Sequence, residues 1–132
     1  MKIKNATMAV CLSLCATSAL ADVAVFATHN IVSAVEDAAG TQVTIDVTVR
    51  NDGEALSGLN LMTMDPFFAV DRAPAIEVGT LAEGETRVIR WTTNSPYAPE
   101  FFNDPFVLAF QGIASATAGE QAFPVVSNGG AQ

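Results

Sequence analysis

Gln42–Arg50 has the sequence QVTIDVTVR, and this stretch decides the fold class. Its four branched aliphatic side chains occupy every second position and alternate with polar side chains. In an extended chain the first set lies on one face and the second set on the other. β-Branched residues with a polar opposite face are typical of a half-buried antiparallel strand. Asn51–Glu54 (NDGE) follows at once, and its Asn, Asp and Gly residues favour a tight turn.

Similar stretches occur on both sides of this strand, with turn signals about every ten residues. Expected strands lie at Val23–Val35, with a kink, and at Leu56–Met64, Phe67–Val70, Ile76–Val78, Thr86–Thr93, Phe106–Ser115 and Gln121–Val126. No segment shows the period of a helix. The pattern predicts an all-β fold, an immunoglobulin-like two-sheet sandwich of about seven antiparallel strands. A small closed barrel is the alternative.

The first 21 residues have the features of a cleaved signal peptide. Lys2 and Lys4 precede the short apolar run Met8–Ala16, and Ala19–Ala21 (ALA) offers the small side chains that signal peptidase requires. Cleavage makes Asp22 the new N-terminus. A buried N-terminal helix and a lipid-attachment box are the alternatives for this segment. The box is disfavoured because the residue before its cysteine is a leucine.

Removal of residues 1–21 changes the composition of the chain. That segment holds two lysines, both cysteines and no acidic residue, so 111 residues with a net charge of −10 remain. We expect a thiol-free sandwich over residues 22–126, a disordered tail over 127–132, and a periplasmic or secreted location. The acidic balance argues against nucleic-acid binding. No later segment reaches the roughly 18 apolar residues of a membrane span.

Two motifs resemble bacterial cell-adhesion-related Ig-like domains of the CARDB group, and related bacterial surface repeats of unknown function. Val47–Gly53 (VTVRNDG) is similar to their V-x-V-x-N-x-G strand and turn. Val78–Glu85 (VGTLAEGE) is similar to the segment before a late strand. The similarity covers residues 41–93. It implies an extracytoplasmic binding or spacer module and assigns no catalytic residue.

The most unusual segment is the twelve-residue connection Asn94–Pro105, which contains three prolines and three aromatic residues. Connections of this length are uncommon in compact domains and are often functional. Proline lowers the entropy of a free loop, and aromatic rings offer contact area with few rotatable bonds. We therefore predict that Tyr97, Phe101 and Phe102 contact a protein or glycan partner. Alternatively, Phe101 and Phe102 fold back and cap an open end of the sandwich.

A second hypothesis is a periplasmic metal or small-ligand carrier. Met62, Met64 and His29 offer soft and imidazole ligands for copper, but no third thioether or His-x-Met pair accompanies them, and methionines that fill gaps in the sheet interior explain the first two better. Loop carboxylates could bind calcium; they are Asp65, Asp71, Glu100 and Asp104. No spaced calcium loop accompanies them, so we predict no metal and no cofactor.

The inventory for catalysis is poor. The mature chain has no cysteine, no lysine and one histidine, and no G-x-S-x-G motif is present. We therefore expect an exported, non-catalytic binding, adhesion or assembly module of the bacterial cell envelope.

Overall fold

The fold is built almost entirely of strands. The computed structural model describes residues 23–38, 40–64 and 75–129, so the expected signal peptide and the expected strand at 67–70 lie outside the described residues. The strands are β2 (Val25–Asp37), β3 (Gly40–Asn51), β4 (Leu56–Thr63), β5 (Ile76–Leu81), β6 (Thr86–Ser95), β7 (Phe106–Ala116) and β8 (Gly119–Gly129). The described residues contain no α-helix; a 3₁₀ helix, η2 (Pro99–Asn103), connects β6 to β7.

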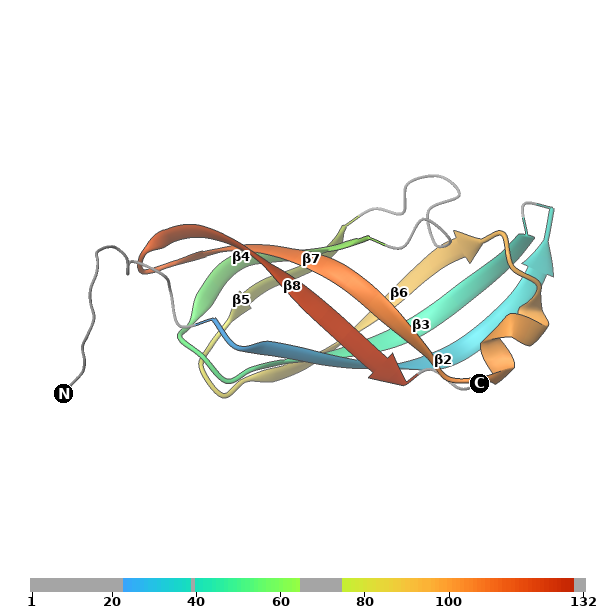
Figure 1. The fold of residues 1–132 in the computed structure, drawn as a ribbon, viewed down its shortest axis with the longest axis horizontal. Coiled ribbons are helices and arrows are strands. Elements are labelled where there is room, and N and C mark those ends of the chain that lie inside the picture. The colour runs from blue at the N-terminus through green and yellow to red at the C-terminus, as the bar shows by residue number, and fades with distance from the viewer. Residues whose placement is uncertain (1–22, 39, 65–74, 130–132) are drawn as a thin grey trace.

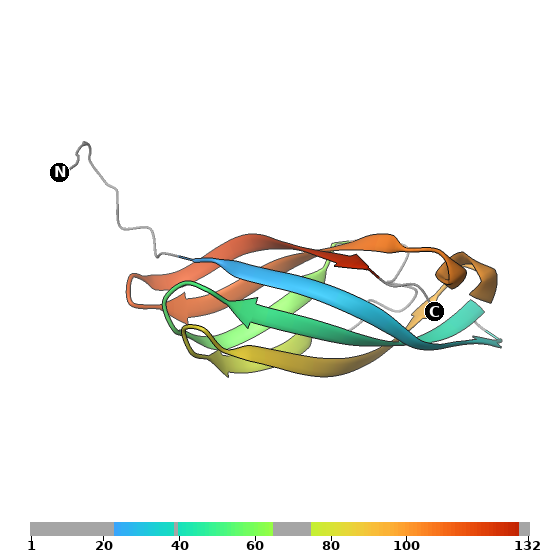
Figure 2. The same ribbon diagram turned by 90° about the horizontal axis from the view of Figure 1, so that it is seen from below.

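All seven strands belong to one hydrogen-bonded sheet, in the order β5-β4-β7-β8-β2-β3-β6. The sheet curves around its core into an elongated, nearly closed barrel (Figures 1 and 2). The all-β prediction is therefore confirmed. One pairing departs from the antiparallel prediction, because β2 and β8 run parallel where Ala27–His29 lie beside Ser127–Gly129. The two-layer arrangement of a sandwich remains a prediction.

The alternation in β3 places its side chains as expected. Val43, Ile45, Val47 and Val49 are fully buried, and the polar residues between them lie toward the outside. Their buried partners come from every other strand and from η2: Ala27, Ile31, Leu56, Leu59, Leu61, Ile76, Val78, Leu81, Trp91, Phe102, Leu108, Phe110, Ala114 and Val125. Burial of these apolar side chains supplies the main favourable free energy of the fold, because the described chain has no disulfide.

The first and last strands differ in detail from the sequence prediction. The sequence predicts the kink of the first strand near residues 28–30, but β2 pairs regularly with β3 there and its register shift lies between Ile31 and Ser33. The expected disordered tail begins too early at residue 127, since β8 continues to Gly129. Gly129 has φ 121°, and a Cβ there would lie 2.5 Å from the carbonyl oxygen of His29. Glycine therefore allows the end of β8 to approach β2 closely.

Asn51 joins two turns at one end of the barrel. Its buried amide nitrogen donates hydrogen bonds to the carbonyl oxygens of Glu54 (2.9 Å) and Leu81 (3.0 Å). Its amide oxygen accepts a hydrogen bond from the backbone of Gly53 at 3.0 Å. Leu81 ends β5 and Thr86 begins β6, the two edge strands of the sheet. The Asn51 side chain thus ties the turn after β3 to the hairpin that joins both edges.

The backbone of Asn51 makes the same connection. Its N–H donates to the carbonyl oxygen of Glu85 at 3.0 Å, and its carbonyl oxygen accepts from the N–H of Gly84 at 2.6 Å. Gly84 has φ 80°, a conformation that favours glycine, so the hairpin can present this N–H. The asparagine of the V-x-V-x-N-x-G motif is therefore a buried, fully bonded amide that stabilises the fold.

Replacement of Asn51 by alanine is expected to lower the free energy of unfolding by about 2–4 kcal/mol, because the buried Leu81 carbonyl, the half-buried Glu54 carbonyl and the Gly53 N–H lose their partner. Urea denaturation measures the change. Asn94→Ala is the matched control, since its exposed amide makes one bond with the Asp37 carboxylate; its loss should be below about 0.5 kcal/mol. Similar losses in both variants would contradict the role given to Asn51.

Candidate functional site

The connection between β6 and β7 forms an aromatic cluster at the end of the barrel opposite the Asn51 turns (Figure 1). The helix η2 begins at Pro99. At this first position the fixed φ of proline suits the helix, and its missing backbone N–H removes no hydrogen bond. The short helix packs beside β2 and projects Phe102 inward. Phe102 is completely buried and meets the Phe106 ring edge-on, with 5.7 Å between centroids. The loop therefore folds back through Phe102, one of the two rings that the alternative prediction assigned to the cap.

The three aromatic residues predicted as contacts have different environments. Phe102 has no exposed surface and belongs to the core. Phe101 is 37% exposed, and Tyr97 is half-buried. The Tyr97 and Phe101 rings are stacked, with centroids 4.3 Å apart and an interplanar angle of 16°. Phe102 thus caps the barrel, and a partly exposed pair of rings, Tyr97 and Phe101, lies next to it.

The backbone of Tyr97 is held on both sides. Its N–H donates to the hydroxyl of Ser95, and its carbonyl oxygen accepts from the hydroxyl of Thr41 at 2.5 Å. Phe101 in turn meets the ring of Phe102 edge-on at 5.0 Å. The stacked pair therefore rests on a buried ring and on two hydroxyl contacts from β3 and β6.

His29 lies beneath the same cluster and has a partner that the sequence analysis missed. Its Nδ1 is 2.6 Å from the Ser127 hydroxyl, both side chains are buried, and its ring lies 4.8 Å from that of Phe106. Ninety-eight positions separate the two residues. The alternation of side chains in β8 is the only feature of the sequence that indicates burial of Ser127, because Ser127 lies on the same inward face as Phe123 and Val125.

Burial lowers the pKa of His29 from 6.5 to about 4, because the uncharged ring is favoured away from water. Its Nε2 has no hydrogen-bond partner among the described residues. A serine and a histidine at this distance resemble part of a nucleophilic pair. Here both are enclosed by the core, so the pair links β2 to β8 and offers no atom to a substrate.

The residues proposed for copper do not come together. The imidazole of His29 points into the core, whereas Met62 and Met64 are 47% and 62% exposed on the outer face. The idea that these methionines fill the interior is also wrong, because Leu59 and Leu61 occupy the inward positions of β4. Of the proposed calcium ligands, Asp65 and Asp71 lie outside the described residues, while Glu100 and Asp104 are exposed. The described residues contain no cluster of three metal-binding side chains.

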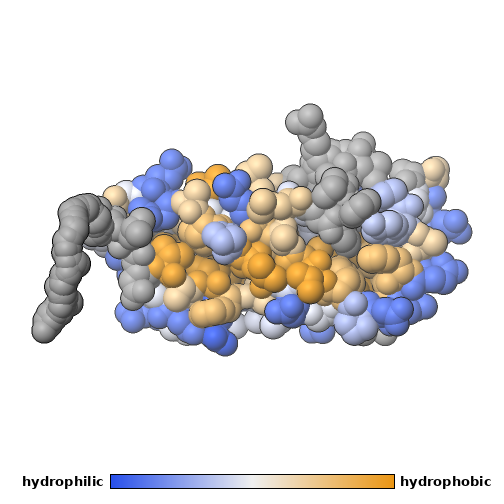
Figure 3. Space-filling view, viewed as in Figure 1, coloured by the Kyte–Doolittle hydropathy of each residue, from blue (hydrophilic) through white to orange (hydrophobic). Residues whose placement is uncertain are grey.

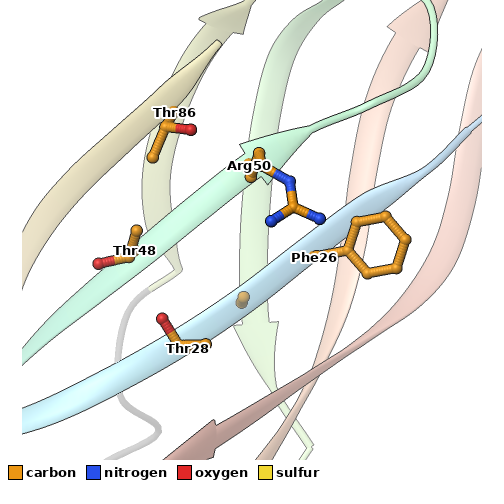
Figure 4. Close-up of a pocket in the computed structure, with 6 residues that line it drawn as sticks. Phe26, Thr28, Thr48, Arg50 and Thr86 are labelled. Carbon is orange, nitrogen blue, oxygen red and sulfur yellow. The ribbon is translucent and has the colours of Figure 1, made fainter. Parts of the chain in front are cut away.

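A shallow hollow of about 130 Å³ lies elsewhere, on the outer face of β2, β3 and β6 (Figure 4). Its walls are Phe26, Ala27, Thr28, Thr48, Arg50 and Thr86. The Arg50 guanidinium lies 5.1 Å from the centre of the Phe26 ring and makes two 2.9 Å bonds with the Asp52 carboxylate. The cation is therefore already paired, and none of the residues predicted as functional lines this hollow.

A scan against protein-family models finds no match for this chain, and neither does a search of the curated proteins. In the described part of the chain, no helix has the length and apolarity to cross a membrane.

Phe102→Ala is expected to lower the free energy of unfolding by about 3–5 kcal/mol, because it opens a cavity under the cap. Phe101→Ala, which removes a partly exposed ring, should cost about 1 kcal/mol or less. Chemical denaturation of both variants measures the difference. Equal losses would show that Phe101 belongs to the core as much as Phe102 does.

The lowered pKa of His29 predicts a loss of stability in mild acid. Between pH 6.5 and about 4 the unfolded chain binds a proton that the folded chain does not, so stability falls as the pH falls. The complete loss is about 3 kcal/mol, all of it retained above pH 6.5.

His29→Leu should remove this dependence between pH 6.5 and 4.5, which unfolding curves at a series of pH values would measure.

Two carboxylates also have lowered pKa values. A hydrogen bond from Arg90 lowers the pKa of Asp46. The pKa of Glu85 is lowered first by a hydrogen bond from the Ala82 N–H and then by one from Arg87. Stability from these carboxylates is lost only below their ordinary pKa values of 3.8 and 4.5. Unchanged slopes in the variant would assign the acid sensitivity to other groups.

Proposed function

We propose that this chain is an exported, non-catalytic binding module of the bacterial cell envelope, with an immunoglobulin-like sandwich as its scaffold. In this scaffold β2, β3 and β6 form one layer, and β5, β4, β7 and β8 form the other. The strand order supports this division, with the parallel β2–β8 pairing as the join. Trp91 of β6 meets Phe110 of β7 edge-on at 5.9 Å, a contact across the core between the two layers.

The export half of the proposal rests on the N-terminal sequence. Residues 1–21 have the charge, the apolar run and the small residues of a cleavable leader. The resemblance of residues 41–93 to CARDB domains and related surface repeats agrees with such a location. Asn51, the asparagine of that motif, is the buried amide that joins the turn after β3 to the β5–β6 hairpin.

The binding half rests on the stacked pair of Tyr97 and Phe101. A free aromatic loop loses conformational entropy when it binds, whereas this pair is already ordered by Phe102, Ser95 and Thr41. Ordered, partly exposed aromatic rings are frequent anchors of protein interfaces, and their flat apolar faces also stack on sugar rings. We therefore propose a protein or glycan of the envelope as the partner.

Site-specific photocrosslinking in the native envelope tests this function. A benzoylphenylalanine at position 101 should give a discrete crosslinked product, and mass spectrometry of the crosslinked peptide should show added amino acids for a protein partner and added sugar residues for a glycan. The same residue at Val88, an exposed position on β6, is the matched control and should give none. Tyr97→Ser should abolish the product at position 101 without unfolding the chain.

Two outcomes would contradict the proposal. The first is an absence of product at position 101, or identical products at 101 and 88. The second concerns export, since intact mass of the same purified protein should show Asp22 as its first residue. Retention of Met1 would show that the leader is not removed.

A further inference from the structure

The two ends of the molecule differ in how their carboxylates are neutralised. Hydrophilic residues gather at both ends in the view of Figure 3, with apolar residues between them. Each arginine of the described residues has a carboxylate partner: Arg50 pairs with Asp52, Arg87 with Glu85, and Arg90 with Asp46. The first two lie beside the Asn51 turns, and Arg90 lies halfway along β6. The described chain therefore places no arginine or lysine at the end with the aromatic cluster.

Two exposed carboxylates at that end belong to the same short segment as Phe101. Glu100 directly precedes Phe101 in η2, and Asp104 is the residue at which this helix ends. Within the described residues, neither carboxylate accepts a hydrogen bond or forms an ion pair. Both negative charges therefore lie in solvent next to a partly exposed ring.

The β2–β3 hairpin brings further carboxylates to the same end (Figures 1 and 2). Glu36 and Asp37 are exposed at the end of β2. Glu36 pairs in register with Thr41, whose hydroxyl donates to the carbonyl oxygen of Tyr97. The hairpin is thus fastened to the backbone of the stacked aromatic pair, and its acidic residues lie on the Tyr97 side of that pair.

Aromatic rings and carboxylates in this arrangement attract the same kind of group. The face of an aromatic ring attracts a positive charge, most often that of an arginine. A guanidinium is planar, so it can stack on a ring while its N–H groups donate to a neighbouring carboxylate. Polymers that carry phosphate or carboxylate groups would be repelled here, and a neutral sugar would leave the carboxylates without a counter-charge.

We propose that the stacked pair of Tyr97 and Phe101 binds a basic segment of a partner protein, which places an arginine or lysine on the rings beside Glu100 and Asp104. Glu36, on the hairpin, attracts a second cation of the same segment. This inference rests on the binding function proposed above. It narrows the partner from a protein or a glycan to a protein with a cationic surface.

An NMR titration of the ¹⁵N-labelled exported protein tests the proposal, with the end-blocked peptide GRGRG as the probe. We expect the backbone amide signals of Tyr97, Glu100 and Phe101 to shift, with a dissociation constant on the order of 1 mM in about 20 mM NaCl. About 150 mM NaCl should weaken binding about threefold, because salt screens exposed charges. The same peptide with citrulline in place of arginine keeps the shape without the charge and should cause no shift.

Carboxylate variants separate local charge from net charge. Glu100→Gln combined with Asp104→Asn should weaken binding of the peptide about fivefold. The matched control is Glu83→Gln combined with Glu120→Gln, which removes two exposed carboxylates at the opposite end. It should change the dissociation constant less than about 1.5-fold. If the first variant loses the spectrum of the folded chain, Glu36→Gln, which lies outside η2, should still weaken binding about twofold.

Phe101→Ala tests the ring apart from the charges, since it leaves all of the carboxylates in place. It should weaken binding of the peptide about threefold, because the guanidinium loses the ring on which it stacks. An unchanged dissociation constant would show that carboxylates alone attract the peptide, and the assignment of the site to the aromatic pair would be wrong.

Three further outcomes would overturn the proposal. One is an absence of shifts up to about 5 mM peptide, or equal shifts with the citrulline peptide. The second is an equal effect of the two double variants, which would assign the attraction to net charge. The third is tighter binding of a neutral N-acetylglucosamine tetrasaccharide, unchanged by Glu100→Gln with Asp104→Asn, which would indicate a glycan site.

The crosslink at position 101 separates this inference from the function on which it rests. A discrete product whose added peptide contains arginine or lysine supports both. A product that contains sugar, or a peptide without a basic residue, keeps the binding function and rejects the cationic partner. An absence of product rejects the binding function itself.

Discussion

The buried amide of Asn51 is the interaction on which the shape of the barrel depends. β5 and β6 are far apart in the order of the sheet, yet consecutive in the chain, so the hairpin between them brings both edges together at one end. Asn51 holds that hairpin through Leu81, Gly84 and Glu85. A buried polar group without a hydrogen-bond partner destabilises a fold. The Asn51 network is stabilising because each donor and acceptor of Asn51 has a partner.

The opposite end of the barrel is closed by apolar contacts. Phe102 fills it, and Phe106 packs between Phe102 and the buried His29. Phe101 packs against the outer side of the buried Phe102 ring, so it is held in place but stays partly exposed. The fold-back prediction for this loop therefore holds for Phe102, and partner contact by Tyr97 and Phe101 stays a prediction.

Much of the fold could be predicted from the sequence, because side-chain alternation is local. The period of two in Gln42–Arg50 correctly separates buried from outward positions, and it does so again around Leu59 and Trp91. The parallel β2–β8 pairing could not be predicted in this way, because it joins segments about 100 positions apart, for which alternation carries no register.

The candidate site was predicted only in part, for a similar reason. Proline and aromatic content marks the 94–105 connection, but which ring turns inward depends on the single turn of η2. Ser127 was assigned to a tail because Ser127–Gln132 is polar and rich in glycine. Its burial follows from a partner, His29, that only the fold brings within 2.6 Å.

The parallel pairing has a mechanical consequence. β2 begins at one end of the molecule and β8 finishes at the other, so tension applied through the two chain ends pulls these neighbours along their length in opposite directions (Figure 1). Their backbone hydrogen bonds, and the His29–Ser127 bond, are then loaded in shear and must break together, whereas a hairpin opened from its end loses its bonds one by one. A chain pulled from its two ends would therefore resist extension at this short parallel pairing.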